Sequence, residues 1–486
     1  MIAGTAKVAR TRLRSDWIVA AGMAAVAVAA IGLAFSSTQF LLVLLCVGLV
    51  AVAVLRFPWF VYAQVFLLPW SPLVYLNLPL HDVALFLRFV LLAGVWFIRR
   101  QEDRPIGAWF FEGKLRKGIL VFVAVATVSL FISALGPNTA AIRLLARLFS
   151  YVAFFFAMVG WLERREQLVS VIKILLFSTL LVALFGFYQV YKNGYTDLYF
   201  QMYPLQEEGG ISDWNGRITS FLFHFNSLAG YLNLVLPFAF GCVVLARGRR
   251  MRLLGVSCLG ATVAALYFTG SRGGLIACGG SLLACLWFLR PSRAAWIRLL
   301  LAGAMAVALI QLLPRFQQGG EGEEEVSVRV QEVDDFTQLS RLALWAAAGS
   351  MFLDHPVLGV GYGNYRSLYH DYIPGSAPDQ LDAHNLYLQL LSETGLIGFL
   401  VFAALIIAFS RMAVRLARDS DPLSRWVGAG VGGGVVATLI HGGVDYLFNV
   451  SPQFGGLFWL VMALAFVAAK MVTMRSESEL APEKYF

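Results

Sequence analysis

Long apolar stretches follow one another along nearly the whole chain, and they constrain the fold more than any other feature of the sequence. A hydrocarbon core about 30 Å thick requires roughly 20 apolar residues per helix. The 486 residues contain about fourteen such stretches (12–14) and only 14% charged residues, whereas an ordinary soluble domain carries about 25%. The sequence therefore predicts an all-α polytopic membrane protein and excludes a soluble enzyme.

The predicted spans divide the chain into three parts. Spans 1 to 11 occupy residues 1–313, a long loop with surface helices occupies 314–385, and spans 12 to 14 occupy 386–486. The spans are expected at Trp17–Phe35, Phe40–Leu55, Trp59–Leu76, Val83–Ile98, Ile119–Leu135, Ile142–Trp161, Leu168–Val190, His224–Ala246, Leu253–Thr269, Gly273–Leu289, Trp296–Leu313, Leu386–Phe409, Val427–Gly442 and Phe454–Val472. All five cysteines fall inside these spans, so we expect core residues and neither a disulfide nor a cysteine metal site.

Lysine and arginine are divided unevenly between the two sides of the membrane. With the N-terminus inside, 27 of the 38 basic residues fall on inner segments and nine on outer ones. Short loops rich in Lys and Arg stay cytoplasmic, so both termini are predicted to be cytoplasmic. The net charge of +9 follows from this topology and does not indicate nucleic-acid binding.

Two outer segments, 191–223 and 314–385, are longer than simple connections, and loops of this length are usually functional or disordered. Within the second, Glu321 to Asp335 form a glycine-rich acidic strip that is expected to be solvated. From Leu339 the pattern becomes helical and predicts a helix lying along the membrane surface. Its expected apolar face consists of Leu342, Trp345, Gly349, Phe352 and Leu353.

Eight of the nine outer basic residues are arginines, and a guanidinium can grip a phosphate bidentately where an ammonium cannot. Arg217, Arg272 and Arg341 stand beside apolar segments, where they could face a site at the lipid boundary. The alternative is that they extend toward the interface or pair with carboxylates such as Asp445.

Three motifs in the second half of the chain carry residues suited to chemistry. Residues 269–274 (TGSRGG) place Arg272 among small residues at the mouth of two spans, where backbone can approach a ligand closely. Residues 355–365 (HPVLGVGYGNY) form a glycine-punctuated turn, which is weak as a phosphate motif because no strand precedes it. Residues 382–398 (DAHNLYLQLLSETGLIG) open a helix with His384 at its start and break it at Gly395. A histidine there could be a cap partner or a base.

In this order, the three motifs resemble those of the O-antigen ligase and polymerase family. The shared patterns are Ser-Arg-Gly-Gly, His-Pro-x-Leu-Gly-x-Gly-x-Gly-Asn-Tyr and His-Asn-x-x-Leu-x-x-x-x-Glu-x-Gly-x-x-Gly, and they lie between about Arg217 and Phe448. The last two patterns are specific in combination, and the first alone is not. The first half of the chain agrees with the family only in hydropathy.

The resemblance implies a bacterial inner-membrane glycosyltransferase of the GT-C class that takes a glycan from undecaprenyl diphosphate at the periplasmic face. It implies that His384 assists the acceptor hydroxyl and that Arg272 and Arg341 bind the diphosphate, with Arg217 as a weaker match. The acceptor would be the lipid A core or another glycan, with membrane lipid as the other partner and no cofactor.

Metal independence is expected because the first outer loop, residues 36–39 (SSTQ), has no carboxylate and no Asp-x-Asp occurs in the predicted outer segments. The sequence leaves several alternatives open. The main one is an O-antigen or exopolysaccharide polymerase on the same scaffold, and an O-linked protein glycosylase is a third version. A solute transporter would use the intramembrane Arg88 and Lys173, and a scaffold without catalysis would leave the ordered motifs unexplained.

Overall fold

The computed structural model describes residues 56–70, 89–96, 113–133, 135–191, 217–222, 224–312, 341–373 and 381–480. In these ranges all regular secondary structure is helical, and ten helices are long and apolar enough to cross a membrane. These ten correspond in order to predicted spans 5 to 14, which confirms the all-α polytopic fold. Spans 1 and 2, the acidic strip and most of the segment 191–223 lie outside the described residues.

The spanning helices differ from the predicted ones only at their ends. They are α6 (Lys114–Ile132), α7 (Thr139–Trp161), α8 (Arg165–Tyr191), α10 (Phe225–Leu245), α11 (Arg249–Phe268), α12 (Arg272–Leu289), α13 (Arg293–Leu312), α16 (Leu386–Ala417), α17 (Pro422–Gly442) and α19 (Pro452–Leu480). The short helices are α3 (Phe57–Phe66), α15 (Tyr365–Tyr372) and α18 (Leu447–Val450), together with residues 89–96 and 341–354.

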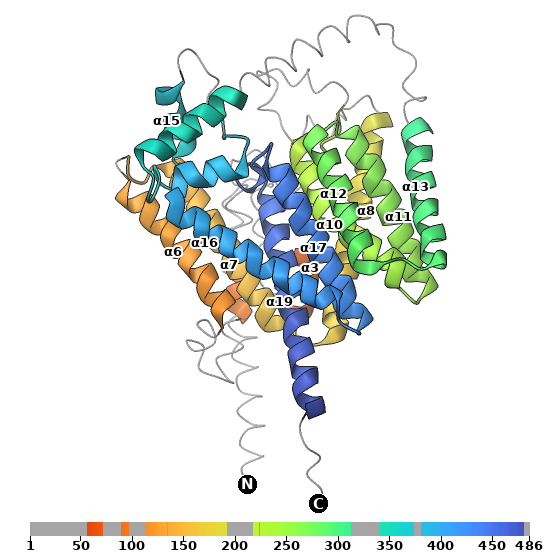
Figure 1. Ribbon diagram of the computed structural model, residues 1–486. Coiled ribbons are helices and arrows are strands. Elements are labelled where there is room, and N and C mark those ends of the chain that lie inside the picture. The colour runs from red at the N-terminus through yellow and green to blue at the C-terminus, as the bar shows by residue number, and fades with distance from the viewer. Residues whose placement is uncertain are drawn as a thin grey trace, which may run out of the picture.

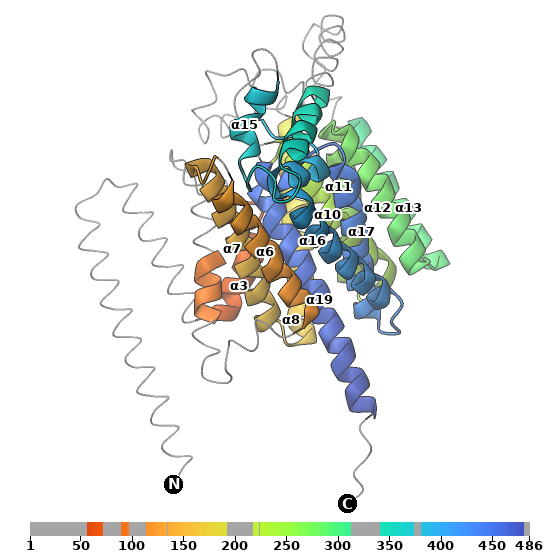
Figure 2. The same ribbon diagram turned by 60° about the vertical axis from the view of Figure 1, so that its left-hand side comes forward.

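Helices α10 and α17 form the centre of the bundle, while α13 lies at its edge (Figures 1 and 2). Helix α17 packs closely because a run of glycines removes side chains from its contact faces. A Cβ on Gly428 would meet the backbone of Ala413 and Ala417, and one on Gly430 would meet the ring of Phe238. Small residues of this kind are the usual means of close helix packing in lipid, where no hydrophobic force drives helices together.

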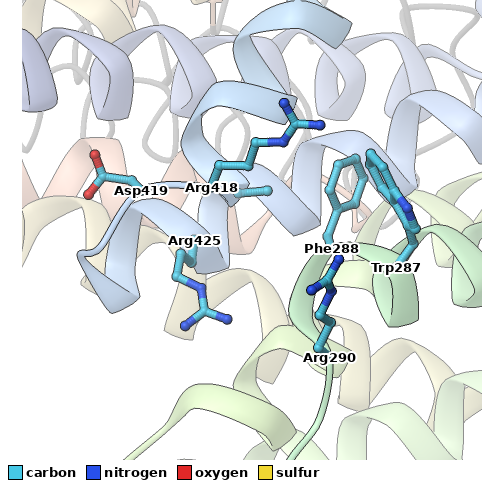
Figure 3. Close-up of a pocket in the computed structure, with 7 residues that line it drawn as sticks. Trp287, Phe288, Arg290, Arg418, Asp419 and Arg425 are labelled. Atoms are coloured by element: carbon cyan, nitrogen blue, oxygen red, sulfur yellow. The ribbon is translucent and has the colours of Figure 1, made fainter.

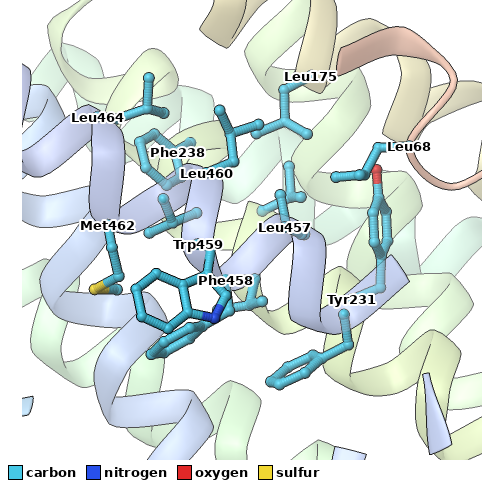
Figure 4. Close-up of a cluster of buried hydrophobic side chains, with 14 of the residues drawn as sticks. Leu68, Leu175, Tyr231, Phe238, Leu457, Phe458, Trp459, Leu460, Met462 and Leu464 are labelled. Carbon is cyan, nitrogen blue, oxygen red and sulfur yellow. The ribbon is translucent and has the colours of Figure 1, made fainter. Parts of the chain in front are cut away.

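The other side of the core is built from α19 and its neighbours (Figure 4). Leu457, Leu460 and Leu464 of α19 are fully buried in the same cluster as Phe238 of α10. The oxygen in this view belongs to the buried Tyr231, whose hydroxyl shares a 3.0 Å hydrogen bond with Thr179 Oγ1 of α8. This buried hydroxyl is therefore satisfied by a partner within the protein, as burial away from water requires.

The prediction of a continuous third span, Trp59–Leu76, is wrong. Helix α3 ends at Phe66, and a turn follows in which the Trp70 N–H donates to the Leu67 carbonyl at 3.1 Å. Pro69 explains the end, because a residue that precedes proline is disfavoured in the helical region and proline itself has no N–H to donate.

Residues 341–372 and 383 form a small second core outside the spanning bundle. The helix over 341–354 confirms the predicted helix, and the side that packs against α15 is a different one from the predicted apolar face. Leu344, Ala347, Ala348 and Met351 are buried against α15, whereas Leu342 and Leu353 are 59% and 76% exposed. The helix carries apolar residues on both sides, so periodicity alone does not set its rotation, and the contact with Tyr365 and Tyr369 of α15 does.

Candidate functional site

The motif residues meet where α10, α12 and α16 begin and α17 ends, at the end of the bundle that carries α15 (Figure 1). The Asn385 amide donates to the Gly443 carbonyl at 2.9 Å, which ties the start of α16 to the end of α17. Ser271 Oγ donates to Asn226 Oδ1 at 2.7 Å and joins the starts of α12 and α10. These two hydrogen bonds join residues that are 58 and 45 positions apart in the sequence.

His384 stands one residue before the cap of α16 and does not cap the helix itself. The cap is Asn385, whose side chain accepts hydrogen bonds from the N–H groups of Tyr387 and Leu388. His384 has a φ of 47°, in the left-handed region that few residues other than glycine adopt. Backbone strain of this kind is found preferentially at functional positions.

The imidazole of His384 is held by Asp445, which lies just beyond α17. Its Nδ1 is 3.1 Å from Asp445 Oδ1, and the two side chains are 23% and 3% exposed. Because an ionised carboxylate can only accept a hydrogen bond, Nδ1 carries the proton and Nε2 is left to accept one. This is the base and orienting carboxylate arrangement that activates hydroxyl groups in many enzymes.

The electrostatics of the pair are mutually reinforcing. Burial alone would lower the pKa of His384, but the hydrogen bond with Asp445 and the charge of its carboxylate outweigh burial and raise that pKa above its ordinary value. Burial alone would raise the pKa of Asp445, yet His384 lowers it well below the usual range. Asp445 is therefore ionised at every physiological pH.

Two further histidines lie near this pair, and the sequence did not single them out. Burial lowers the pKa of His224 to about 4, and the charges of Asp445, His384, Arg217 and Arg341 all act on it. His441 is buried in the last turn of α17. A neutral His224, whose Nδ1 accepts from the Asn226 N–H at 3.1 Å, serves as the cap of α10. The only signal in the sequence was the placement of each histidine at the end of a span.

The predicted residues Arg217 and Arg272 lie on the two sides of the same turn. The guanidinium of Arg217 stacks 4.6 Å from the ring centroid of Phe225, and its side chain passes over Gly270, where a Cβ would lie 2.9 Å from Nε. Arg272 is exposed in the first turn of α12. A Cβ on Gly273, the next residue, would lie 2.4 Å from Val444 and 3.3 Å from His441, so this turn packs directly against the segment that carries Asp445.

Arg341 reaches the site from the helix outside the bundle. It is half-buried, and its charge acts on both His224 and His384. Among the described residues its Nε atom has no hydrogen-bonding partner. The structure thus places His384, Arg217 and Arg341 around His224, and it places Arg272 in the turn that packs against the segment with Asp445. Sequence reasoning assigned Asp445 no role beyond that of a possible arginine partner.

The glycine-punctuated turn over 355–365 has a structural role. The N–H groups of Val360 and Gly361 donate to the carbonyls of Ser392 and Glu393, at 2.8 and 3.1 Å. The Asn364 amide donates to Ser133 Oγ and to the Gly136 carbonyl, each at 3.2 Å. Since these backbone groups are engaged within the protein, the turn fixes the outer helices on the bundle and is not available to cradle a phosphate.

The segment before His384 is fixed from both sides. The Arg366 Nε donates to Asp382 Oδ1 at 2.9 Å, and the Ala383 N–H donates to Gln389 Oε1 at 2.7 Å. Gln389 in turn donates to the fully buried Glu393 at 2.8 Å. The glutamate of the third motif therefore supports the position of the histidine and does not enter the site itself.

The helix break predicted at Gly395 is present within α16. Gly395 has φ 60° and ψ −167°, a region essentially restricted to glycine, and a Cβ there would lie 2.3 Å from the Val357 carbonyl oxygen.

We expect Gly395→Ala to cost more than about 3 kcal/mol and to reduce the monodisperse yield and Tm in detergent. Gly349→Ala is the matched control, since its added methyl meets nothing within 4 Å, and equal Tm values for the two variants would contradict the assignment.

Comparison with known proteins identifies the central part of this chain. Residues 257–403 match the family model described as O-antigen ligase, which confirms the resemblance inferred from the motifs. The matched range contains Arg272, Arg341 and His384, whereas Arg217 and Asp445 lie outside it. No curated protein matches the chain.

Proposed function

We propose that this chain, whose O-antigen ligase domain spans residues 257–403, transfers a glycan from undecaprenyl diphosphate to an acceptor hydroxyl such as that of the lipid A core. The observation that supports the proposal most strongly is the His384 and Asp445 pair within a group of three arginines. A base beside a polycationic surface suits a reaction that deprotonates a hydroxyl and releases a diphosphate.

In the proposed reaction, His384 Nε2 accepts the proton of the acceptor hydroxyl while its oxygen bonds to the anomeric carbon of the donor glycan. The bond from that carbon to the phosphate oxygen breaks, and undecaprenyl diphosphate leaves with the electron pair. Negative charge grows on the leaving group, so cations fixed beside it stabilise the transition state more than the ground state. Arg341 and Arg272 are the proposed diphosphate ligands, with Arg217 supporting the turn that carries Arg272.

The proposed site faces the periplasm. The support is the excess of Lys and Arg on the opposite side of the predicted topology, together with the helix breaks and the outer helices on the site side. A lipid-linked donor would enter from the bilayer, and a polar acceptor would enter from the side of the outer helices.

A pH dependence follows from the raised pKa of His384. As a base His384 must be neutral, so transfer should increase as pH rises through its folded pKa, above the ordinary value of about 6.5. In Asp445→Asn the carboxylate is lost while burial remains, so the pKa of His384 should fall. The rising limb of the pH–rate profile should then move to lower pH. The maximal rate should also fall, because an amide can hold the ring in the wrong tautomer. A pH profile of kcat from pH 5 to 9 measures both effects, and an unmoved limb would show that Asp445 does not act on the base.

We also expect transfer to need no divalent ion, because residues 36–39 have no carboxylate and the predicted outer segments contain no Asp-x-Asp. The purified protein should keep its transfer rate in excess chelator, since the arginines supply the positive charge that a metal would otherwise supply. A loss of rate that manganese or magnesium restores, and that sodium at equal ionic strength does not, would overturn metal independence.

The experiment that tests the proposed function is reconstitution of the full chain in vesicles with one lipid-linked glycan and a lipid A core acceptor. The ligase proposal predicts a single glycan added to the core and release of undecaprenyl diphosphate. Growth of a longer lipid-linked glycan without the core would instead establish a polymerase on the same site. If neither product forms and the glycan reaches a protein acceptor or crosses the bilayer unchanged, the proposal fails.

A further inference from the structure

At the end of α12 away from Arg272, three arginines surround a cavity of about 400 Å³ (Figure 3). It is lined chiefly by Trp287, Phe288, Arg290, Arg418, Asp419 and Arg425. Helix α12 has 18 residues and is therefore about 27 Å long, close to the thickness of the hydrocarbon core. The cavity therefore lies at the membrane surface opposite His384 and takes no part in the site already described.

The charge around this cavity is positive. Its one carboxylate, Asp419, accepts two hydrogen bonds from Arg475, at 2.9 and 3.1 Å, and its negative charge is thereby offset. Arg418 lies 5.9 Å from the ring centroid of Trp287, and Arg425 donates to the Leu289 carbonyl at 3.3 Å. Arg290 ends α12 in the left-handed region, with φ 45°, a position usually taken by glycine. The cavity thus presents guanidinium groups without an internal anion to match them.

The cavity continues into an apolar surface on α12. Trp287, Leu283 and Ile276 are 57%, 69% and 66% exposed, and their spacings of four and seven residues place them on one face of the helix. In a bilayer this face contacts acyl chains. A ligand that fits both regions has an anionic head at the arginines and a hydrocarbon chain along α12.

We propose that this cavity binds the phosphodiester headgroup of an anionic phospholipid, with an acyl chain lying along Trp287 and Leu283. Basic pockets between membrane helices select such headgroups, and the guanidinium fork matches two phosphate oxygens at once. A free phosphate would use the arginines but not the apolar face, so the continuous surface favours the lipid. The proposal is independent of the glycosyltransferase function, because binding alone tests it.

The test is native mass spectrometry of the purified full chain in detergent, titrated separately with phosphatidylglycerol and phosphatidylcholine. Phosphatidylglycerol should be retained preferentially by the wild type. The double variant Arg290→Gln, Arg418→Gln should bind it about 30-fold more weakly, since each basic residue near the surface contributes about a factor of five. Arg425 is kept because it holds the end of α12. The matched control is Arg249→Gln, Arg250→Gln, which removes two exposed arginines from the start of α11 on the same side and should bind like the wild type.

Three results would overturn the proposal. Equal retention of the two lipids would remove headgroup selectivity, and an equal loss in the α11 control would reduce the effect to general surface charge. Displacement of the lipid by millimolar glycerol phosphate or inorganic phosphate would identify a free phosphate as the ligand. If the double variant unfolds, Arg290→Lys, Arg418→Lys keeps both charges and should show a smaller but measurable loss, because an ammonium lacks the planar fork.

Discussion

Replacing His384 with alanine should slow glycan transfer by about 10²–10⁴-fold, the usual contribution of general-base assistance, while the affinity for the lipid-linked donor stays within about twofold of the wild type. The structure supports this division because Nδ1 of His384 is bound to Asp445 and only Nε2 remains to meet the acceptor. Asn385, and not His384, caps α16. The loss is therefore expected in turnover, whereas a lost cap would remove about 0.5–2 kcal/mol of stability.

The left-handed backbone at His384 requires a matched variant, because alanine adds strain there and asparagine tolerates this conformation better. His384→Asn should therefore fold at least as well as His384→Ala and transfer as slowly. A folded His384→Asn protein with the wild-type transfer rate would refute the role of His384 as a base.

Replacing Arg341 with lysine should weaken donor binding by about 10–150-fold, because it retains the charge and loses a bidentate bond to the diphosphate worth about 1.5–3 kcal/mol. Arg341 should show a larger effect than Arg272. It is half-buried and its charge acts on both His224 and His384, whereas Arg272 is exposed. Equilibrium binding of the lipid-linked donor measures the affinities, and the rate should fall with them.

The control for this prediction is Arg143→Lys, which changes an exposed arginine near the start of α7 that contributes nothing to the proposed site. It should leave donor affinity unchanged. Equal affinities for the wild type, Arg341→Lys and Arg272→Lys would show that neither guanidinium grips the diphosphate.

Much of the bundle could be predicted because hydrophobic length is a local property. Ten predicted spans have matching helices, and the break at Gly395 was visible as a glycine between two apolar segments. The same reasoning failed for Trp59–Leu76, where Pro69 interrupts an apolar run that composition alone reads as continuous. The rotation of the helix over 341–354 could not be predicted, because its apolar residues occupy both faces and only its contact with α15 decides which side is buried.

The residues of the site could be predicted from the sequence only in part, for a related reason. His384, Arg272 and Arg341 stand in motifs with recognisable neighbours. Asp445 stands alone in the sequence, and its pairing with His384 depends on the end of α17 meeting the start of α16 through Asn385 and Gly443. The positions of His224 and His441 near this pair likewise depend on helix packing. Contacts between segments that are distant in the sequence produce no local sequence pattern, so they could not be predicted from the sequence.

The most direct test of the proposed division of labour is to measure donor affinity and the single-turnover rate at saturating donor on the same preparations of wild type, Arg341→Lys and His384→Asn. The proposed mechanism predicts that Arg341→Lys loses donor affinity, while His384→Asn binds donor normally and loses about 10²–10⁴-fold in the transfer step. Loss of donor affinity in His384→Asn, with a transfer rate at saturation equal to that of the wild type, would contradict it.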